Sequence, residues 1–294
     1  MKEPVFIGAA TAIITPFSGA GIDYHAYDCL LEKQIDAGIQ AIVVCGTTGE
    51  ASTMSMMEKQ ELIDHTVRFV KDQCKVIAGI GTNSTEHSIE MAKIAYNCGA
   101  DSLLAVTPYY NKCTQEGLVQ HYCAIADSTP LPLITYNVPG RTGVNIAPET
   151  CKRLSAHSKI NGLKEAGGNI SQVARIKGQC EEDFHIWSGN DDQITAIMSL
   201  GGCGVISVLS NIYPKLVVKL VNACLEGNYA LSASLQCAYM PFIDGLFSEV
   251  NPIPIKAVLS AQGLCEDTLR LPLVPMSSQN RNKLLQILHS LPKE

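Results

Sequence analysis

The chain has 294 residues, of which 46% are hydrophobic and 17% are charged, and its net charge is −6. These values are typical of a globular protein with one large domain and a smaller appended unit. Because the chain is acidic and has no basic cluster, we expect small-molecule chemistry and no nucleic-acid partner. No apolar run approaches the roughly 18 residues of a membrane helix, so we also expect no membrane partner.

The start of the chain and its cysteines indicate the compartment. Met1-Lys2-Glu3-Pro4 has neither the apolar core nor the cleavage site of a signal peptide. The 12 cysteines are scattered, without a Cys-x-x-Cys pair or a histidine spacing typical of zinc. We interpret most of them as small buried side chains in a reducing cytoplasm, and we expect no metal site.

Strand-like and helix-like patterns alternate from the start of the chain. The expected strands are apolar or β-prone runs at residues 6–17, 41–45, 76–80, 102–106, 133–136, 160–164, 185–187 and 205–208. The expected helices follow them, at about 24–37, 55–70, 85–97, 115–127, from 148, 170–178, 192–200 and 214–225. Eight such units predict an α/β fold, a closed (β/α)₈ TIM barrel over residues 1–225. An open doubly wound sheet is the alternative, but no Gly-x-Gly-x-x-Gly turn follows the first strand.

The rest of the chain, residues 226–294, shows no strand pattern. Apolar residues at helical spacing predict three helices there, at about 229–247, 254–261 and 278–291. We interpret this region as a small C-terminal three-helix domain.

Polar side chains collect at the carboxyl ends of the expected strands, which form the active-site face of such a barrel. Together with Ile206 on the eighth strand, the set is Thr47, Thr48, Tyr109, Tyr110, Tyr136, Arg141 and Lys164. Each has an ordinary structural interpretation, such as a glycine turn, core packing or a solvated loop charge. Lys164 at a strand end either pairs with Glu165 or is an amine whose pKa burial lowers, so that it attacks a carbonyl as a nucleophile. Glu50 is interpreted as a brace for the glycine turn rather than as a catalytic acid.

Five motifs carry a resemblance that covers residues 6–275. Gly46-Thr47-Thr48-Gly49-Glu50, Tyr136-Asn137-Val138-Pro139 with Arg141, and Gly162-Leu163-Lys164-Glu165 resemble the pyruvate-dependent class I aldolase superfamily. Thr107-Pro108-Tyr109-Tyr110-Asn111, Arg141 and Asn251-Pro252-Ile253-Pro254-Ile255-Lys256 resemble its dihydrodipicolinate synthase family. This implies a lyase of lysine biosynthesis that condenses pyruvate with aspartate semialdehyde.

The resemblance also implies a role for each site residue. Lys164 would hold pyruvate as a Schiff base, so that no cofactor is needed, and Tyr136, Thr47 and Tyr110 would relay protons. Thr48 and the backbone of Ile206 would hold the carboxylate of pyruvate, and Arg141 that of the aldehyde. Tyr110 would come from a neighbouring subunit, which implies a homodimer that assembles into a homotetramer.

Two alternatives share these residues. An N-acetylneuraminate lyase or a 2-keto-3-deoxy sugar-acid aldolase would use the same lysine and tyrosine with a polyol as second substrate. A pyruvate-sensing barrel would bind without turnover. The resemblance further implies an interface pocket that binds the end product lysine in some members. Its matching positions here are Ala51, Ser52, Met56, Lys59, Asn83, His87 and Tyr109. Because His87 stands where lysine-sensitive members carry a glutamate and Lys59 adds a like charge, we expect an enzyme insensitive to lysine.

Overall fold

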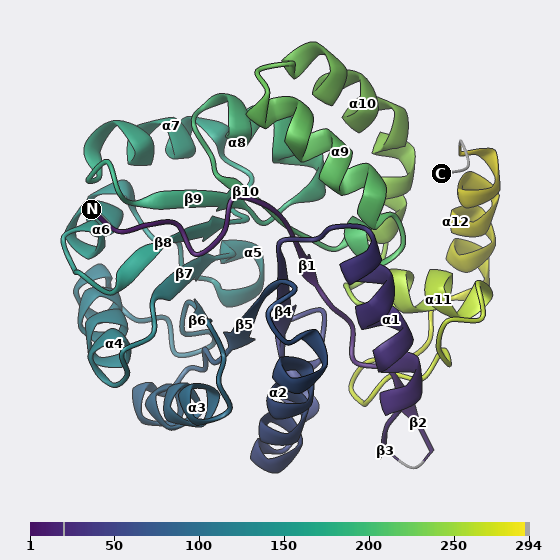
Figure 1. Cartoon of the computed structure of the whole chain (residues 1–294), viewed down its shortest axis with the longest axis horizontal. Helices are drawn as coiled ribbons and strands as arrows, with labels where there is room; N and C mark the ends of the chain where they lie inside the picture. The colour runs from purple at the N-terminus through teal and green to yellow at the C-terminus, as the bar shows by residue number, and fades with distance from the viewer. Residues whose placement is uncertain (20, 292–294) are drawn as a thin grey trace.

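The computed structural model describes residues 1–19 and 21–291 and contains a closed eight-stranded parallel barrel surrounded by helices (Figure 1). Residues 20 and 292–294, which fall inside the two predicted units, lie outside the described residues. The barrel strands are β1 (Gly8–Ala12), β4 (Ala41–Val44), β5 (Lys75–Gly79), β6 (Ser102–Val106), β7 (Leu133–Asn137), β8 (Ile160–Glu165), β9 (His185–Ser188) and β10 (Gly204–Ser207). Each pairs in parallel with the next along the chain, and β10 closes the barrel against β1. The predicted (β/α)₈ barrel is therefore confirmed.

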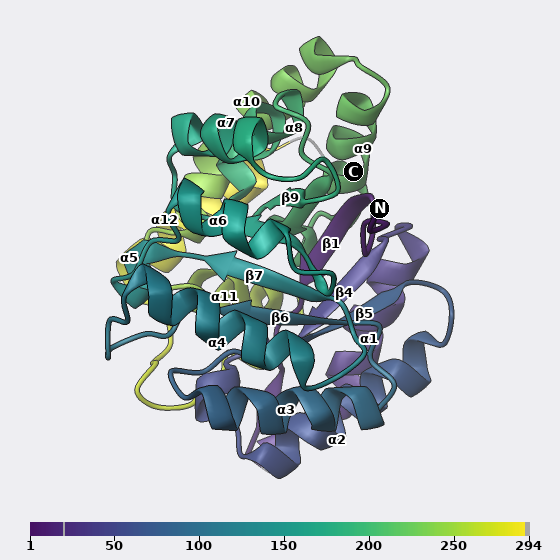
Figure 2. The same cartoon turned by 90° about the vertical axis from the view of Figure 1, so that its left-hand side faces the viewer.

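Helices cover the outside of the barrel, as the side view shows (Figure 2). The helices that follow the barrel strands are α1 (Tyr24–Asp36), α2 (Met56–Val70), α3 (Thr85–Asn97), α4 (Gln115–Asp127), α6 (Pro148–Ser155), α7 (Ile170–Gln179), α8 (Ile194–Ser199) and α9 (Pro214–Leu225). Several begin with side-chain caps. The Ser55 hydroxyl accepts from Glu58 N, and the Glu58 carboxylate accepts from Ser55 N at 2.8 Å, which completes a capping box.

Two short stretches differ from the sequence prediction. The first strand is shorter than residues 6–17, because β1 ends at Ala12 and Phe17–Ser18 instead form β2, which pairs antiparallel with β3 (Gly21–Ile22). Pro16, which has no N–H to give to a sheet, precedes β2. The expected loop after β7 contains the one-turn helix α5 (Pro139–Thr142), which begins at Pro139 and ends at Gly143 with φ 72°. Proline at the first position and a left-handed glycine after the last are recognisable signals of a helix.

Two separate cores result from the alternation of side chains along each strand. One set of side chains fills the inside of the barrel, including Ala10, Leu104, Ile134, Trp187 and Ile206. A larger set packs between the strands and the surrounding helices. Because the inner set of side chains fills the middle of the barrel, space for a ligand remains toward the carboxyl ends of the strands.

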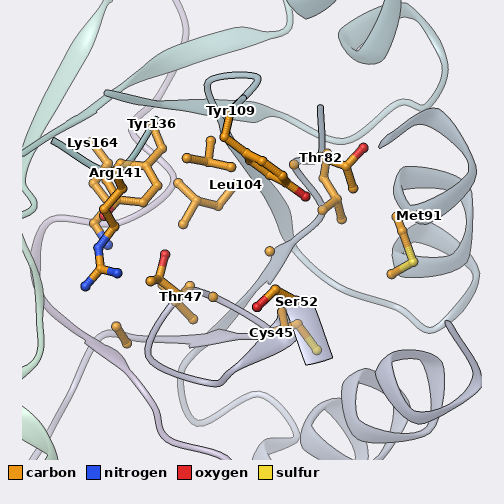
Figure 3. A pocket seen from close by; sticks show the side chains of 18 of the residues that line it. Cys45, Thr47, Ser52, Thr82, Met91, Leu104, Tyr109, Tyr136, Arg141 and Lys164 are labelled. Atoms are coloured by element: carbon orange, nitrogen blue, oxygen red, sulfur yellow. The ribbon is translucent and has the colours of Figure 1, made fainter. Parts of the chain in front are cut away.

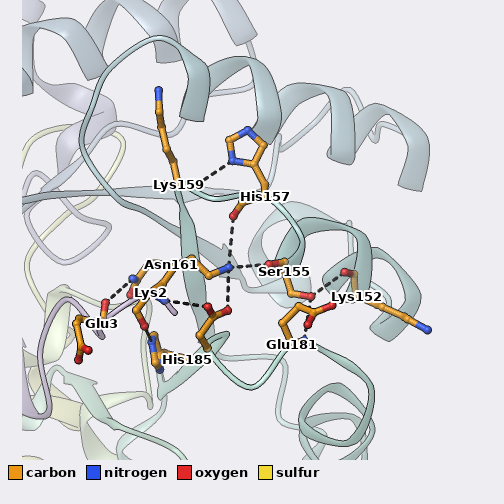
Figure 4. A network of polar contacts seen from close by, with 10 residues as sticks. Lys2, Glu3, Lys152, Ser155, His157, Lys159, Asn161, Glu181 and His185 are labelled. Carbon is orange, nitrogen blue, oxygen red and sulfur yellow. Dashed lines mark hydrogen bonds and ion pairs between the residues drawn. The ribbon is translucent and has the colours of Figure 1, made fainter.

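The N-terminal segment crosses the opposite end of the barrel (Figure 4). Lys2 Nζ donates to Ser155 O at 2.6 Å, and the carbonyl of Glu3 accepts from Asn161 Nδ2 at 2.8 Å. His185 Nε2 lies 2.9 Å from the carbonyl of Lys2. These contacts fix the segment across the amino-terminal ends of β8 and β9, so that this end of the barrel is covered.

The three C-terminal helices are α10 (Tyr229–Leu246), α11 (Ile253–Ala261) and α12 (Ser278–Ser290), close to the predicted ranges. They lie along one side of the barrel, where α10 packs against α9 and α8 (Figure 1). The division of the chain at residue 226 into two domains stays a prediction. Among the described helices, none combines the length and the apolar character that crossing a membrane requires.

Candidate active site

A cavity of about 280 Å³ opens among the carboxyl ends of β4 to β8. Lys164, Tyr136, Arg141 and Thr47 lie at one side of it, and Ser52, Thr82 and Met91 at the other (Figure 3). Four of the seven predicted site residues therefore line one cavity, although they come from segments up to 117 residues apart in the chain.

Lys164 and Tyr136 are direct neighbours in the barrel. The two residues are paired in the register of β7 and β8, so their side chains point to the same face of the sheet, the barrel interior. Lys164 Nζ lies 4.3 Å from the centroid of the Tyr136 ring. Burial lowers the pKa of Lys164 to about 7, with a smaller contribution from the nearby Arg141 cation. A large share of the Lys164 amine is therefore uncharged near neutral pH.

The surroundings of Lys164 distinguish between its two interpretations. Among the described residues, Lys164 forms no ion pair, and the Glu165 carboxylate is instead bound by Asn137 Nδ2 at 3.0 Å and by the N–H of Gly167. A Cβ on Gly189 would lie 2.8 Å from Ala166 Cβ and 3.0 Å from Lys164 Cε, so a side chain at this position would crowd both residues. Of the two interpretations of Lys164, the ion pair with Glu165 is therefore absent among the described residues.

Asp191 is a buried carboxylate near Lys164 that the sequence analysis did not identify. It accepts hydrogen bonds from Ser207 Oγ at 2.5 Å, Val208 N at 3.0 Å and Leu209 N at 2.9 Å, at the end of β10. Its negative charge favours the protonated form of Lys164 and so limits the fall in the pKa of that amine. In the sequence, its place in the loop after β9 puts it on the active-site face of the barrel but does not indicate that it approaches Lys164.

Tyr136 and Thr47 are the two predicted proton-relay residues that line the cavity. Burial raises the pKa of the Tyr136 hydroxyl, and a hydrogen bond with the Thr47 side chain opposes this. The phenol therefore stays protonated at neutral pH and can donate to, or accept from, a group bound at Lys164. Thr47 lines the cavity in the turn after β4.

Thr48 and Arg141 are joined through a residue from the C-terminal region. Asn251 Nδ2 donates to Thr48 Oγ1 at 3.0 Å, and Arg141 Nη2 donates to the carbonyl of Asn251 at 3.2 Å. Thr48 is 2% exposed, whereas Arg141 is exposed at the mouth of the cavity. The two predicted carboxylate-binding side chains are therefore held by one segment, which the sequence analysis quoted only as part of a motif.

Glu50 does not line the cavity, and its contacts agree with the predicted bracing role. Its Oε1 lies 2.5 Å from Lys256 Nζ in α11, and both side chains are almost completely buried. Its Oε2 accepts from Arg270 N at 3.0 Å. Glu50 adopts φ 53°, in the left-handed region, directly after the turn that contains Thr47 and Thr48. The ion pair therefore fixes this turn against the C-terminal helices.

Of the other predicted residues, Thr48, Tyr110 and Ile206 do not line the cavity, whereas Tyr109 does. Ile206 is fully buried in β10. Tyr110, with φ 72°, is 90% exposed and does not line the cavity. Tyr109 does line it, together with Ser52 and Lys59 from the predicted effector positions. Four of the seven predicted effector positions, Ala51, Ser52, Lys59 and Tyr109, thus line the same cavity as Lys164.

This arrangement can perform carbonyl chemistry. A largely neutral amine can form an imine with a keto acid, a neighbouring phenol can move protons, and hydroxyl and guanidinium groups can bind carboxylates. Among the described residues, no group of three or more His, Cys, Asp or Glu side chains is arranged to hold a metal ion.

Comparison with known proteins agrees with this chemistry. The family model described as the dihydrodipicolinate synthetase family matches residues 5–291. The 4-hydroxy-tetrahydrodipicolinate synthase of Alkaliphilus oremlandii is 50% identical over 281 residues, which cover 96% of this chain and 97% of the relative. The crystal structure of dihydrodipicolinate synthase from Thermotoga maritima is 43% identical, with a TM-score of 0.95 and coverage of 97% and 98%. A second similar structure is the chloride-inhibited dihydrodipicolinate synthase of Acinetobacter baumannii complexed with pyruvate, at 40% identity, a TM-score of 0.95 and the same coverage. The chain therefore belongs to the dihydrodipicolinate synthetase family.

Proposed function

We propose that the chain is a Schiff-base lyase that condenses pyruvate with L-aspartate-4-semialdehyde to give 4-hydroxy-tetrahydrodipicolinate, in the diaminopimelate route to lysine. One observation carries the chemistry: the buried amine of Lys164, with a pKa of about 7, lies 4.3 Å from the centre of the Tyr136 ring. The family membership and the relatives' names support the choice of substrates.

The reaction balances without a separate cofactor. The Lys164 amine attacks the keto carbon of pyruvate, and loss of water leaves a protonated imine. The cationic imine draws electrons from the adjacent methyl group, which releases a proton and becomes an enamine. The enamine carbon attacks the aldehyde of the second substrate, whose oxygen takes up a proton. The amino group of the new chain then attacks the imine carbon, closes the ring and releases Lys164.

The other site residues supply protons and binding contacts in this proposal. Tyr136 gives and takes protons beside the imine, and Thr47 connects it toward Tyr110 of a neighbouring subunit. The high exposure of Tyr110 in the single chain supports such an exchange between subunits. The proposed assembly is accordingly a homodimer for the shared site and a homotetramer overall.

Binding contacts explain the choice of two carboxylate substrates. Thr48 and the backbone of Ile206 hold the carboxylate of pyruvate, and Arg141 holds that of the aldehyde. The guanidinium of Arg141 is exposed at the mouth of the cavity, where an incoming anion meets it first. The cytoplasm is the proposed compartment, supported by 12 cysteines without a disulfide between described residues.

The test combines a trap with a product assay. Incubation with pyruvate and borohydride is expected to add one reduced pyruvyl group to Lys164, located by peptide mass, and Lys164→Ala should abolish the label. A coupled assay with pyruvate and aspartate semialdehyde should show turnover, whereas N-acetylneuraminate should not be cleaved. Labelling of another lysine would overturn the mechanism, and cleavage of the sugar acid alone would overturn the substrate.

A further inference from the structure

The segment between α10 and α11 contacts both of the residues to which carboxylate binding is assigned. Asn251 lies 203 residues after Thr48 and 110 residues after Arg141 in the chain, and it touches both side chains. Its side chain bonds to Thr48, whereas its backbone carbonyl bonds to Arg141. The two contacts use different atoms, so a side-chain substitution can remove the first and leave the second.

The contact with Thr48 determines which way that hydroxyl donates. A hydroxyl has one donor and two acceptor positions. The Asn251 amide N–H occupies an acceptor position of Thr48 Oγ1 at 3.0 Å, and this is the hydrogen bond found for that oxygen among the described residues. The Thr48 O–H is therefore left free to donate, as a carboxylate requires.

The contact with Arg141 orients a second donor, the guanidinium group of that residue. Arginine presents five N–H groups in a fixed fork. The carbonyl of Asn251 takes one of them, on Nη2 at 3.2 Å. This fixes the plane of the guanidinium at the cavity mouth and leaves the other N–H groups for a ligand.

The side chain of Asn251 also destabilises the folded protein. Its Oδ1 is buried and has no hydrogen-bond partner among the described residues. A buried unpaired amide oxygen destabilises a folded protein. A small apolar residue at this position would avoid that penalty, so stability does not explain the asparagine.

We infer that Asn251 is a positioning residue for pyruvate: its amide orients the Thr48 hydroxyl as a donor to the substrate carboxylate. The inference rests on the proposed function, because it takes pyruvate as the ligand beside Thr48. It predicts that Asn251 acts through Thr48 and affects the first substrate more than the second, because the carbonyl that holds Arg141 stays in any variant.

The test compares four proteins: the wild type, Asn251→Ala, Thr48→Val and the double variant. The concentration of pyruvate that gives half-maximal borohydride trapping at Lys164 should rise about 3- to 10-fold in Asn251→Ala. The KM for aspartate semialdehyde should change little, and the midpoint of urea unfolding should stay the same or rise, because alanine removes the buried unpaired oxygen. The double variant should resemble Thr48→Val alone, because the amide has no hydroxyl left to orient.

Asn251→Asp provides a matched control of shape. Its carboxylate has nearly the same size but accepts the Thr48 O–H instead of donating to it, so it should weaken pyruvate binding at least as much as alanine does. An unchanged half-saturation in Asn251→Ala, or additive losses in the double variant, would overturn the inference. Absence of a pyruvate adduct at Lys164 in the wild type would instead refute the proposed function.

Discussion

The buried amine of Lys164 is expected to lower the stability of the protein that uses it. Its pKa falls from an ordinary 10.5 to about 7 on folding, because the charged form loses its hydration in the barrel. Between these two values the unfolded chain holds a proton that the folded chain has lost. The free energy of unfolding of the wild type therefore rises with pH across this window.

The size of this effect follows from the two pKa values. At about 1.4 kcal/mol for each pKa unit, the full penalty is about 5 kcal/mol below pH 7 and disappears above the pKa that Lys164 has in the unfolded chain. Between pH 6 and pH 9 the wild type should recover roughly 2–3 kcal/mol of it. Lys164→Met has a side chain of similar length and no titrating group. It should be more stable than the wild type at pH 6, with an advantage smaller by about that amount at pH 9.

Urea unfolding at a fixed protein concentration measures the difference, because a constant concentration removes the contribution of subunit association. Lys93→Met is the matched control, since Lys93 is exposed on α3 and the same substitution there should give a difference from the wild type that does not depend on pH. An advantage of Lys164→Met that stays constant from pH 6 to pH 9 would refute the argument that Lys164 is buried at the expense of stability.

Three further predictions concern the rest of the site. Glu50→Gln should lower the free energy of unfolding by about 3–5 kcal/mol, because Lys256 would be left as a buried cation, and a second change of Lys256 to Met should recover much of that loss in urea unfolding. Tyr110→Phe and Lys164→Ala should each be nearly inactive, with losses of activity on the order of 10²-fold or more. Mixed dimers of the two variants should regain activity, because one of their two sites is intact. Mixed dimers as inactive as their parents would refute the shared site. L-lysine at about 1 mM should leave the initial rate at sub-saturating pyruvate almost unchanged because His87 offers no negative charge, and half-inhibition below that concentration would contradict this.

The barrel could be predicted from local patterns because a strand buried on both faces must be apolar along its length. Residues 41–44 in β4 and 103–106 in β6 have this character, and turns of recognisable chemistry separate them from the helices. Lys164 was predictable for a related reason, as a lysine at the end of such a strand. The predicted helices of the C-terminal region were recognisable from their 3.6-residue spacing.

The contacts that tune the site could not be predicted in the same way. Asp191 approaches Lys164 only because β8 and β9 are neighbours in the barrel, and Asn251 meets Thr48 across 203 residues of sequence. Both contacts join residues that are far apart in the sequence, so no local sequence pattern indicates them. Lys256 was quoted in a motif, but its pairing with Glu50 depends on the packing of α11 against the turn after β4.

The long sequence distance between Asn251 and its two contacts has a consequence for synthesis. A ribosome releases the chain from the N-terminus, and the last barrel strand ends at residue 207. Thr48 and Arg141 remain without their anchor until residue 251 has emerged, and Glu50 waits for Lys256 and Arg270. A nascent chain can therefore close its barrel before Thr48 and Arg141 have made their contacts with Asn251. Lys164 is already in place at that stage, but the contacts of Thr48 and Arg141 with Asn251 form only after the final fifth of the polypeptide has begun to emerge.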